Sequence, residues 1–315
     1  MAEELSEKLF GESPAMKAVF RQIKQAAATD IPVLLYGETG TGKDLAARAI
    51  HAQSERREGP FMAVNLAALP QELVASELFG HEKGAFTSAE QRREGKFELA
   101  DNGTIFLDEI AAIDEKVQVS LLRLIERKSF HRLGGRAAIS TNARLIAASN
   151  QDLAEDVKRG TFREDLYYRL DVFRIVMPPV RERRTDIPAL IDVFLQRFNK
   201  NLDKDIAGIS PECVAILEAY DWPGNVRELK NVIQRAALVC NGDILLPEHL
   251  PPRFRKIPSQ RPAVSFEVGT PLAEVEREMI VRTLESVGHN RTHAAEKLGI
   301  SRRALYNKMR RYNIA

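Results

Sequence analysis

A glycine-rich turn near the start of the chain constrains its fold more than any other segment. The apolar run Val33–Tyr36 is typical of a buried strand, and a helical pattern covers residues 44–53. Between them the spacing G-x-x-x-x-G-K is formed by Gly37, Glu38, Thr39, Gly40, Thr41, Gly42 and Lys43. Glycines let backbone N–H groups curl around phosphates, and the lysine reaches the terminal ones. The pattern therefore predicts a phosphate-binding loop rather than a glycine turn with an incidental lysine.

The residue after the lysine departs from the general pattern. Asp44 stands where a serine or threonine hydroxyl ordinarily binds Mg²⁺. A carboxylate beside phosphates is repelled unless it faces the metal or points away from the phosphates. The metal must then depend more on a second acidic site.

An apolar run followed by two carboxylates supplies that site. Asp108 and Glu109 come directly after Ile105–Leu107, so they lie at the sheet edge where ligands of α/β folds bind. We expect Asp108 to hold Mg²⁺ through water and Glu109 to polarise the attacking water. Alone, the pair also fits an ordinary helix start, where acidic residues are favoured. Combined with the phosphate-binding loop, it predicts a site that binds and hydrolyses ATP.

Composition places the chain among ordinary globular proteins. Of its 315 residues, 44% are apolar and 29% are charged. Apolar runs all fall short of the roughly 18 residues needed to cross a bilayer, and the first 30 residues lack a secretory pattern. We therefore expect a cytoplasmic protein with no membrane partner. Cys213 and Cys240 are expected to be reduced packing residues.

Strand and helix patterns alternate in the first half of the chain, which indicates a parallel sheet in an α/β domain. Further strands are predicted at Phe61–Val64, Ile105–Leu107, Leu145–Ala148 and Phe173–Val176. After Pro179 the pattern becomes purely helical. The predicted division is an α/β nucleotide-binding part at 1–178, a helical part at 179–250, a proline-rich linker at 251–271 and a small all-helical domain at 272–315.

The last domain has the pattern of a helix-turn-helix module. Helices are predicted at 272–287, 291–298 and 302–312, and Gly299-Ile300-Ser301 forms a glycine turn that ends in a serine N-cap. From His289 onward seven basic residues face one acidic residue, a formal charge of +6. The predicted contacts to double-stranded DNA are made by Arg302, Arg303, Tyr306, Asn307, Lys308 and Arg310. A basic helical hairpin used for oligomerisation is the alternative.

Several further motifs give the chain a resemblance to a known family. Residues 9–250 resemble the sigma-54 interaction domains of bacterial enhancer-binding proteins, which are AAA+ ATPases, and the tail resembles their Fis-type DNA-binding module. The resemblance implies a parallel sheet with a helical lid subdomain. An acidic residue commonly follows the lysine in this family, although glutamate is more usual than Asp44.

The most diagnostic resemblance is the segment Gly84, Ala85, Phe86, Thr87, Ser88 and Ala89, which is similar to the family's GAFTGA loop. The resemblance implies that this loop contacts the sigma factor. By its residues alone, small side chains flank one aromatic, which fits either an exposed anchor or a Phe buried beneath a glycine turn. Ser88 departs from the family's second glycine and is the weakest point of the prediction.

The resemblance also implies roles for residues outside these motifs. Asn65 would restrain Glu109 as a switch, and Asn150 would act as the first nucleotide sensor. In W-P-G-N-V-R-E-L, Arg227 would be the second sensor, which contacts the nucleotide from the lid. Arg163 and Arg169 would neutralise phosphoryl charge across a subunit boundary, for which the guanidinium fork is suited.

The motifs and the resemblance together imply an activator of sigma-54 RNA polymerase that binds enhancer DNA as a dimer and hydrolyses ATP in a ring, which the family suggests is a hexamer. Two alternatives remain at this point. One is an AAA+ enzyme that remodels another protein, and the other is a regulator of the same architecture whose sigma contact is degenerate. Because the nucleotide domain begins almost at Met1, either a regulator acting in trans or a removed regulatory domain is expected.

Overall fold

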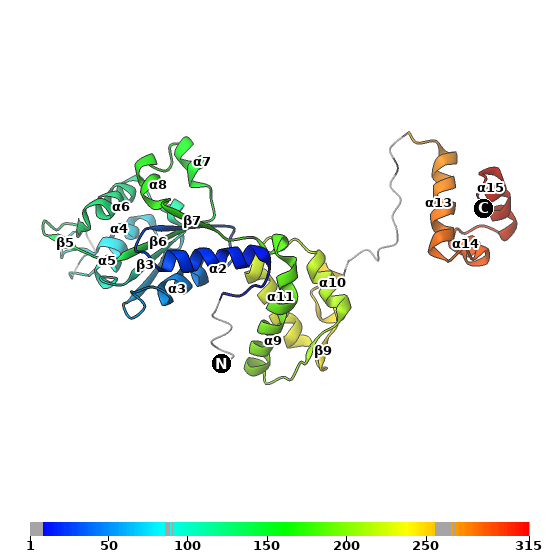
Figure 1. Ribbon diagram of the computed structural model, residues 1–315, viewed down its shortest axis with the longest axis horizontal. Helices are drawn as coiled ribbons and strands as arrows, with labels where there is room; N and C mark the ends of the chain where they lie inside the picture. Colours follow the sequence, from blue (N-terminus) through cyan, green and yellow to red (C-terminus); the bar gives the residue numbers. More distant parts are fainter. Residues whose placement is uncertain (1–8, 86–88, 90, 256–265, 267–268, 315) are drawn as a thin grey trace. The chain divides into compact units, whose positions relative to one another are not determined.

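The computed structural model describes residues 9–85, 89, 91–255, 266 and 269–314 (Figure 1). It divides into two compact units, Met1–Arg255 and Lys256–Ala315. Within the described ranges, no helix is both long enough and apolar enough to cross a membrane.

Five parallel strands form the sheet of the first unit, as predicted. Their order is β2-β3-β6-β1-β7, with bounds Phe61–Asn65 (β2), Thr104–Asp108 (β3), Arg144–Ser149 (β6), Val33–Tyr36 (β1) and Phe173–Val176 (β7). Asn65 is paired with Asp108, and Tyr36 with Ser149. The phosphate-binding loop and the acidic pair therefore leave the sheet at the same edge, because parallel strands share the direction of their carboxyl ends.

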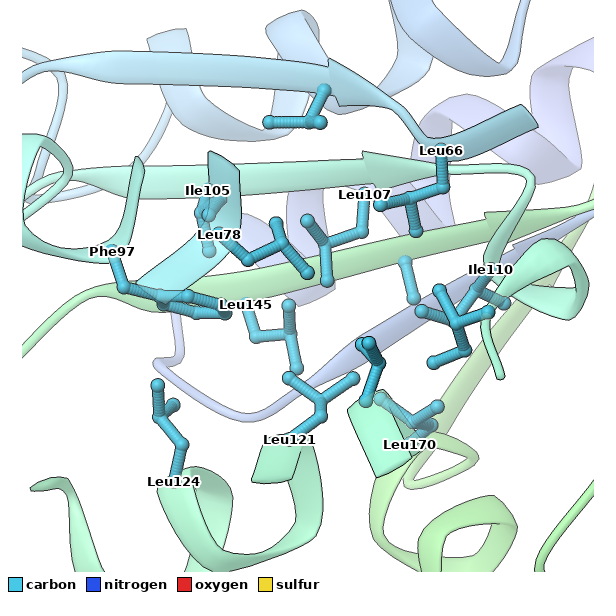
Figure 2. Close-up of a cluster of buried hydrophobic side chains, with 14 of the residues drawn as sticks. Leu66, Leu78, Phe97, Ile105, Leu107, Ile110, Leu121, Leu124, Leu145 and Leu170 are labelled. Atoms are coloured by element: carbon cyan, nitrogen blue, oxygen red, sulfur yellow. The ribbon is translucent and has the colours of Figure 1, made fainter. Parts of the chain in front are cut away.

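Both faces of the sheet are apolar, which explains why its strands appear as continuous apolar runs in the sequence. Ile105, Leu107 and Leu145 point into one cluster, which Figure 2 shows between the sheet and Leu121 and Leu124 of α6. Alternate residues, among them Val33, Leu35, Phe106 and Ile146, point into a second cluster on the other face.

Helices cover the two faces of this sheet. The second cluster is closed by α2 (Pro14–Ala27) and α3 (Lys43–Ala52). The first is closed by α4 (Gln71–Phe79), α5 (Lys96–Leu99), α6 (Glu115–Arg127), α7 (Leu153–Lys158) and α8 (Glu164–Leu170). Short 3-10 turns η1 (Leu66–Ala68) and η2 (Ile110–Ala112) follow β2 and β3, and an antiparallel hairpin of β4 (Ser129–His131) and β5 (Ala138–Ser140) follows α6.

The lid subdomain has its own core. It comprises η3 (Val180–Glu182), η4 (Arg184–Asp186), α9 (Ile187–Leu202), α10 (Pro211–Ala219), α11 (Asn225–Val239), η5 (Pro247–His249) and α12 (Pro252–Arg255). Trp222 is fully buried, and its Nε1 donates to the carbonyl of Leu217 at 2.7 Å. Cys213 and Cys240 are buried in the same core and are not bonded to each other.

Two details of the lid differ from the sequence prediction. The subdomain is not wholly helical, because β8 (Gly208–Ile209) and β9 (Ile244–Leu245) pair in parallel. The segment from 251 was expected to be linker, but α12 belongs to the lid: Phe254 is buried, with its ring centroid 5.5 Å from that of Trp222. Phe254 and an ion pair between Arg253 and Glu228 at 2.7 Å hold this four-residue helix, whose sequence has no visible period.

The second unit is a three-helix module, as predicted. It contains α13 (Leu272–Ser286), α14 (Arg291–Lys297) and α15 (Arg302–Arg311). Ser301 Oγ accepts a hydrogen bond from Ala304 N at 3.2 Å, which confirms the predicted N-cap of α15. The core of the unit is formed by Ile280, Leu284, Ala294, Ala295, Leu305 and Met309.

Leu121→Ala tests the packing between α6 and the sheet. Leu121 is fully buried, so we expect the substitution to lower the free energy of unfolding by about 2–5 kcal/mol. Leu73→Ala on α4 is the matched control, because Leu73 is 44% exposed, and its cost should stay below about 0.5 kcal/mol. Urea titration followed by circular dichroism measures both. Equal losses would contradict the described core.

Candidate functional site

The backbone of the phosphate-binding loop adopts conformations that suit glycine. Gly40 has φ +81° and Gly42 has φ +97°, both in the left-handed region. Gly42 is also the N-cap of α3, so the first turn of that helix begins directly at Lys43. The loop thus combines a tight main-chain turn with a helix N-terminus, the arrangement that binds phosphate groups.

The side chain of Lys43, at the end of the phosphate-binding loop, folds back onto the start of that loop. Its Nζ donates to the carbonyl oxygens of Gly37 at 2.7 Å and Glu38 at 3.4 Å. Burial lowers the pKa of Lys43, while the nearby carboxylates of Glu109 and Asp108 oppose that shift. The structure therefore brings the predicted lysine and the predicted acidic pair into one electrostatic cluster.

The acidic pair is partly withdrawn from water. Burial raises the pKa of Asp108 and of Glu109, and the Lys43 ammonium acts against both shifts. Glu109 itself has φ +56°, a conformation that is rare outside glycine and frequent at functional sites. Desolvated carboxylates of this kind have a strong preference for a cationic partner.

Neither predicted asparagine bonds to the Glu109 side chain through its own side chain in the described residues. Asn65 Oδ1 accepts from Ala68 N at 3.1 Å and caps η1. Asn150 Nδ2 donates to Thr39 Oγ1 at 3.2 Å, and its backbone N–H lowers the pKa of Glu109. Asn150 therefore joins the loop to the acidic pair, whereas the switch role of Asn65 stays a prediction.

The lid holds the phosphate-binding loop through a set of contacts that we call the lid clamp, formed by Glu38, Arg181 and Asn225. Arg181 donates to both carboxylate oxygens of Glu38, at 2.6 and 2.9 Å, and Asn225 Nδ2 donates to Glu38 at 3.0 Å. These bonds lower the pKa of Glu38 to about 2, with the Arg181 hydrogen bond the largest cause. The sequence prediction missed Arg181 and gave no role to Asn225, although Asn225 lies in the W-P-G-N turn.

Arg227 lies at the mouth of a cavity between the loop and the lid. The cavity has a volume of about 670 Å³, and its lining includes Thr39, Arg227, Arg235 and Arg253. The positive charge of Arg227 acts on Lys43, Asp108 and Glu109, which places it beside the same cluster. The predicted second sensor is thus close to the predicted catalytic carboxylates.

A narrow apolar pocket adjoins the other side of the loop. It is lined by Leu9, Phe10, Thr41, Gly42, Leu45, Arg183, Leu190, Val193, Phe194 and Val226. These residues come from the chain start, the loop and the lid, which is why the sequence gave no local signal for the pocket. An apolar lining beside a phosphate-binding loop is chemically suited to an aromatic base.

Among the described residues, neither predicted arginine finger bonds to this cluster: Arg163 is the N-cap of α8 and Arg169 lies in its last turn. Arg163 makes two bonds to Asp165, at 2.7 and 3.0 Å, and Arg169 lies 3.4 Å from Glu126. Both arginines are therefore held in exposed ion pairs, which are worth little in water. Such pairs are readily exchanged for a stronger anionic partner.

Part of the predicted sigma-contact loop can be located. Phe86, Thr87 and Ser88 lie outside the described residues. At its base, Gly84 N donates to the Ala89 carbonyl at 2.8 Å. Arg132, to which the sequence gave no chemistry, anchors the neighbouring segment through ion pairs with Glu82 and Glu98.

The predicted DNA contacts divide into two groups. The side chains of Arg302, Arg303, Tyr306, Asn307 and Arg310 are exposed on α15. Lys308 differs, because its ammonium is paired with Glu276 of α13. Lys308 therefore helps to hold α15 on α13, and its predicted DNA contact stays a prediction. Arg291, which the prediction did not include among the contacts, lies over the Tyr306 ring at 5.2 Å from its centroid.

A phosphate-binding loop on a parallel sheet, a helical lid that contacts this loop, and a separate helix-turn-helix unit define an AAA+ ATPase with a DNA-binding module. Comparison with known families agrees. Residues 9–176 match the sigma-54 interaction domain, residues 181–265 the AAA+ ATPase lid domain, and residues 271–312 the bacterial regulatory protein Fis family. The chain belongs to the sigma-54-dependent transcriptional activator family.

Individual relatives cover almost the whole chain. The transcriptional regulatory protein ZraR of Salmonella typhimurium is 48% identical over 303 residues, which cover 96% of this chain and 68% of that protein. The regulatory protein AtoC of Escherichia coli is 46% identical, with 96% and 67% covered. Among solved structures, NtrX from Brucella abortus in complex with ATP has a TM-score of 0.72 at 32% identity, covering 96% of this chain and 69% of that one.

Arg181→Met tests the lid clamp. An exposed ion pair is worth up to about 1 kcal/mol, so its loss should raise amide hydrogen exchange in residues 37–43 by up to about fivefold. Arg174→Met is the control, because it breaks a surface pair with Asp171 that does not involve the lid. Exchange that rises equally in both variants, or in neither, would show that the clamp does not hold the loop.

Proposed function

We propose that this protein hydrolyses ATP between the subunits of a ring and uses the energy to remodel the closed promoter complex of sigma-54 RNA polymerase. The observation that carries this proposal is the cluster of Lys43, Asp108 and Glu109, partly buried at the sheet edge beside the phosphate-binding loop. Family membership supports it, since the matched domain is named for sigma-54 interaction.

ATP would bind to two neighbouring parts of the site, the phosphate-binding loop and the apolar pocket. The phosphates bind to the backbone of Gly37–Lys43, and the base enters the apolar pocket between Phe10 and the lid. Arg227 senses the phosphates from the lid, and Asn150 senses them from the end of β6. The pocket is narrow in this structure, so base binding requires the lid to shift slightly away from the loop.

The donor set fits Mg²⁺. In the described residues no group of three or more His, Cys, Asp or Glu side chains forms a metal cage. Mg²⁺ does not need one, because it commonly binds to one or two carboxylates, water and substrate phosphates. Asp108 would hold it through water, and the ion would offset charge on the phosphate oxygens. Asp44 is exposed in the first turn of α3, a favoured position for a carboxylate, and we assign it a secondary role near the metal.

Glu109 is the proposed general base. Burial raises the pKa of Glu109 towards the working pH. A general base is most effective when its pKa lies close to that pH, because it is then both ionised and basic. It would take the proton of the attacking water while Asn65 restrains it in the waiting state. Turnover would fall as pH drops through this raised pKa, because the protonated carboxyl cannot accept a proton.

Arg163 and Arg169 are proposed to act in the neighbouring subunit. They lie at the two ends of α8 and pair with surface carboxylates rather than with the cluster of their own chain. Guanidinium groups are suited to neutralise phosphoryl charge across a boundary. This assignment requires a ring, which we take to be a hexamer as in the family. Control by a regulator in trans is part of the proposal.

Sigma-factor contact and DNA binding are assigned to different parts of the chain. The loop Gly84–Ala89, with Phe86 as its anchor, would contact the sigma factor and move with hydrolysis. The second unit would bind double-stranded enhancer DNA as a dimer through Arg302, Arg303, Tyr306, Asn307, Lys308 and Arg310. Because its proposed partners are DNA and RNA polymerase, we expect the protein to act in the cytoplasm.

A mixing experiment tests the shared active site. Arg163→Ala/Arg169→Ala and Glu109→Gln should each lose at least about 100-fold in ATP turnover. In a mixture, an intact Glu109 meets intact arginines at about a quarter of randomly formed interfaces, so turnover should recover towards a quarter of the wild-type rate. Arg159→Ala, at the exposed end of α7, should retain wild-type turnover. A mixture that shows only the average of the two variants would contradict action in trans.

A further inference from the structure

Arg183 is a buried arginine whose charge is incompletely satisfied. Arg183 is 2% exposed, and its Nη2 donates to the Thr41 carbonyl at 3.1 Å. Its Nε is buried and has no hydrogen-bond partner among the described residues. Neither does any described carboxylate lie within 4.0 Å of its guanidinium. A buried N–H group without an acceptor costs folding free energy unless a ligand or a water molecule accepts its hydrogen bond.

Asp186, whose negative charge acts on Arg183, makes its hydrogen bonds elsewhere. Asp186 Oδ1 accepts from Glu12 N at 2.8 Å and from Ser13 N at 2.7 Å, and its Oδ2 accepts from Ser13 Oγ at 2.8 Å. Asp186 thereby fixes the start of the chain against the lid, and with it the wall of the apolar pocket that Leu9 and Phe10 form. The charge of Asp186 offsets part of the desolvation of Arg183 but leaves the Arg183 Nε without a hydrogen bond.

Arg183 lines that pocket and is the one charged side chain among the described residues of the lining. The hydroxyl of Thr41, the other polar side chain of the lining, already donates to the Glu38 carbonyl at 2.8 Å. An apolar pocket with one charged donor suits an aromatic ring that carries an acceptor atom. An arginine has no acceptor, so it cannot bond to the exocyclic amine of adenine, but it can donate to a ring nitrogen.

We infer that Arg183 is a base-recognition residue, whose Nε–H donates to a ring nitrogen of the purine bound in the apolar pocket. The inference rests on the proposed binding of ATP at the phosphate-binding loop. Because Arg183 also bonds to the Thr41 carbonyl, it would connect the base to the loop that holds the phosphates. A nucleotide that lacks the acceptor would leave this donor buried and unpaired, which is the strongest form of hydrogen-bond discrimination.

The experiment measures the Kd of the full chain for ATP, 1-deaza-ATP, 3-deaza-ATP and 7-deaza-ATP by calorimetry. We expect one analogue to bind about 10- to 100-fold more weakly than ATP, the range for a hydrogen bond from a charged donor, and the other two to bind like ATP. In Arg183→Met this selectivity should fall to within about threefold. Any general loss from the broken Thr41 bond affects all four nucleotides and cancels in their ratios.

Arg184→Met is the matched control. Arg184 is adjacent in sequence, but it bonds to Asp221 at 2.8 Å and to the carbonyls of Arg181 and Glu218, and it does not line the pocket. It should keep the wild-type selectivity. Selectivity that persists in Arg183→Met, or three analogues that bind wild-type protein as well as ATP does, would overturn the inference while leaving ATP binding intact.

A second measurement does not depend on the variant folding. The ¹⁵N resonance of the Arg183 Nε–H should shift when wild-type protein binds ATP, and should not shift in the same way with sodium triphosphate or with the weak-binding analogue. Equal shifts with all three would overturn the inference. Wild-type protein that binds neither ATP nor triphosphate would overturn the proposed function as well.

Discussion

The close contact between the lid and the phosphate-binding loop depends on the absence of a side chain at Gly40. A Cβ atom there would lie 2.4 Å from the Gly224 carbonyl oxygen, a distance that backbone atoms do not allow. With glycine, Val226 N donates to the Gly40 carbonyl at 3.0 Å, and α11 begins directly against the loop. The lid clamp and the two pockets lined by Arg227 and Arg183 each combine residues of the loop with residues of the lid. All three therefore depend on this close approach of the lid to the loop.

Burial separates the parts of the proposed mechanism. Lys43, Asp108 and Glu109 are partly withdrawn from water and shift one another's pKa, so they form one electrostatic group within a single chain. Arg163 and Arg169 are exposed and paired only with surface carboxylates. The cluster has no arginine finger from its own chain, which is consistent with the proposal that a neighbouring subunit supplies one.

Much of the fold could be predicted because it depends on local signals. The strands Val33–Tyr36 and Phe173–Val176 were predicted with the bounds that the structure has, since short apolar runs flanked by polar turns are unambiguous here. The apolar pocket could not be predicted, because Phe10, Thr41 and Arg183 meet only in the folded chain. The same applies to Lys308: its basic side chain suggested DNA, and only packing of α15 on α13 brings it to Glu276.

Promoter opening tests the central claim most directly, because it requires the site, the loop and the DNA-binding unit together. Purified protein would be mixed with sigma-54 RNA polymerase and a sigma-54 promoter that carries the protein's DNA site, and single-stranded DNA at the start site would be measured. The account predicts opening with ATP and none with a non-hydrolysable analogue or with Glu109→Gln. ATP turnover without promoter opening would contradict it.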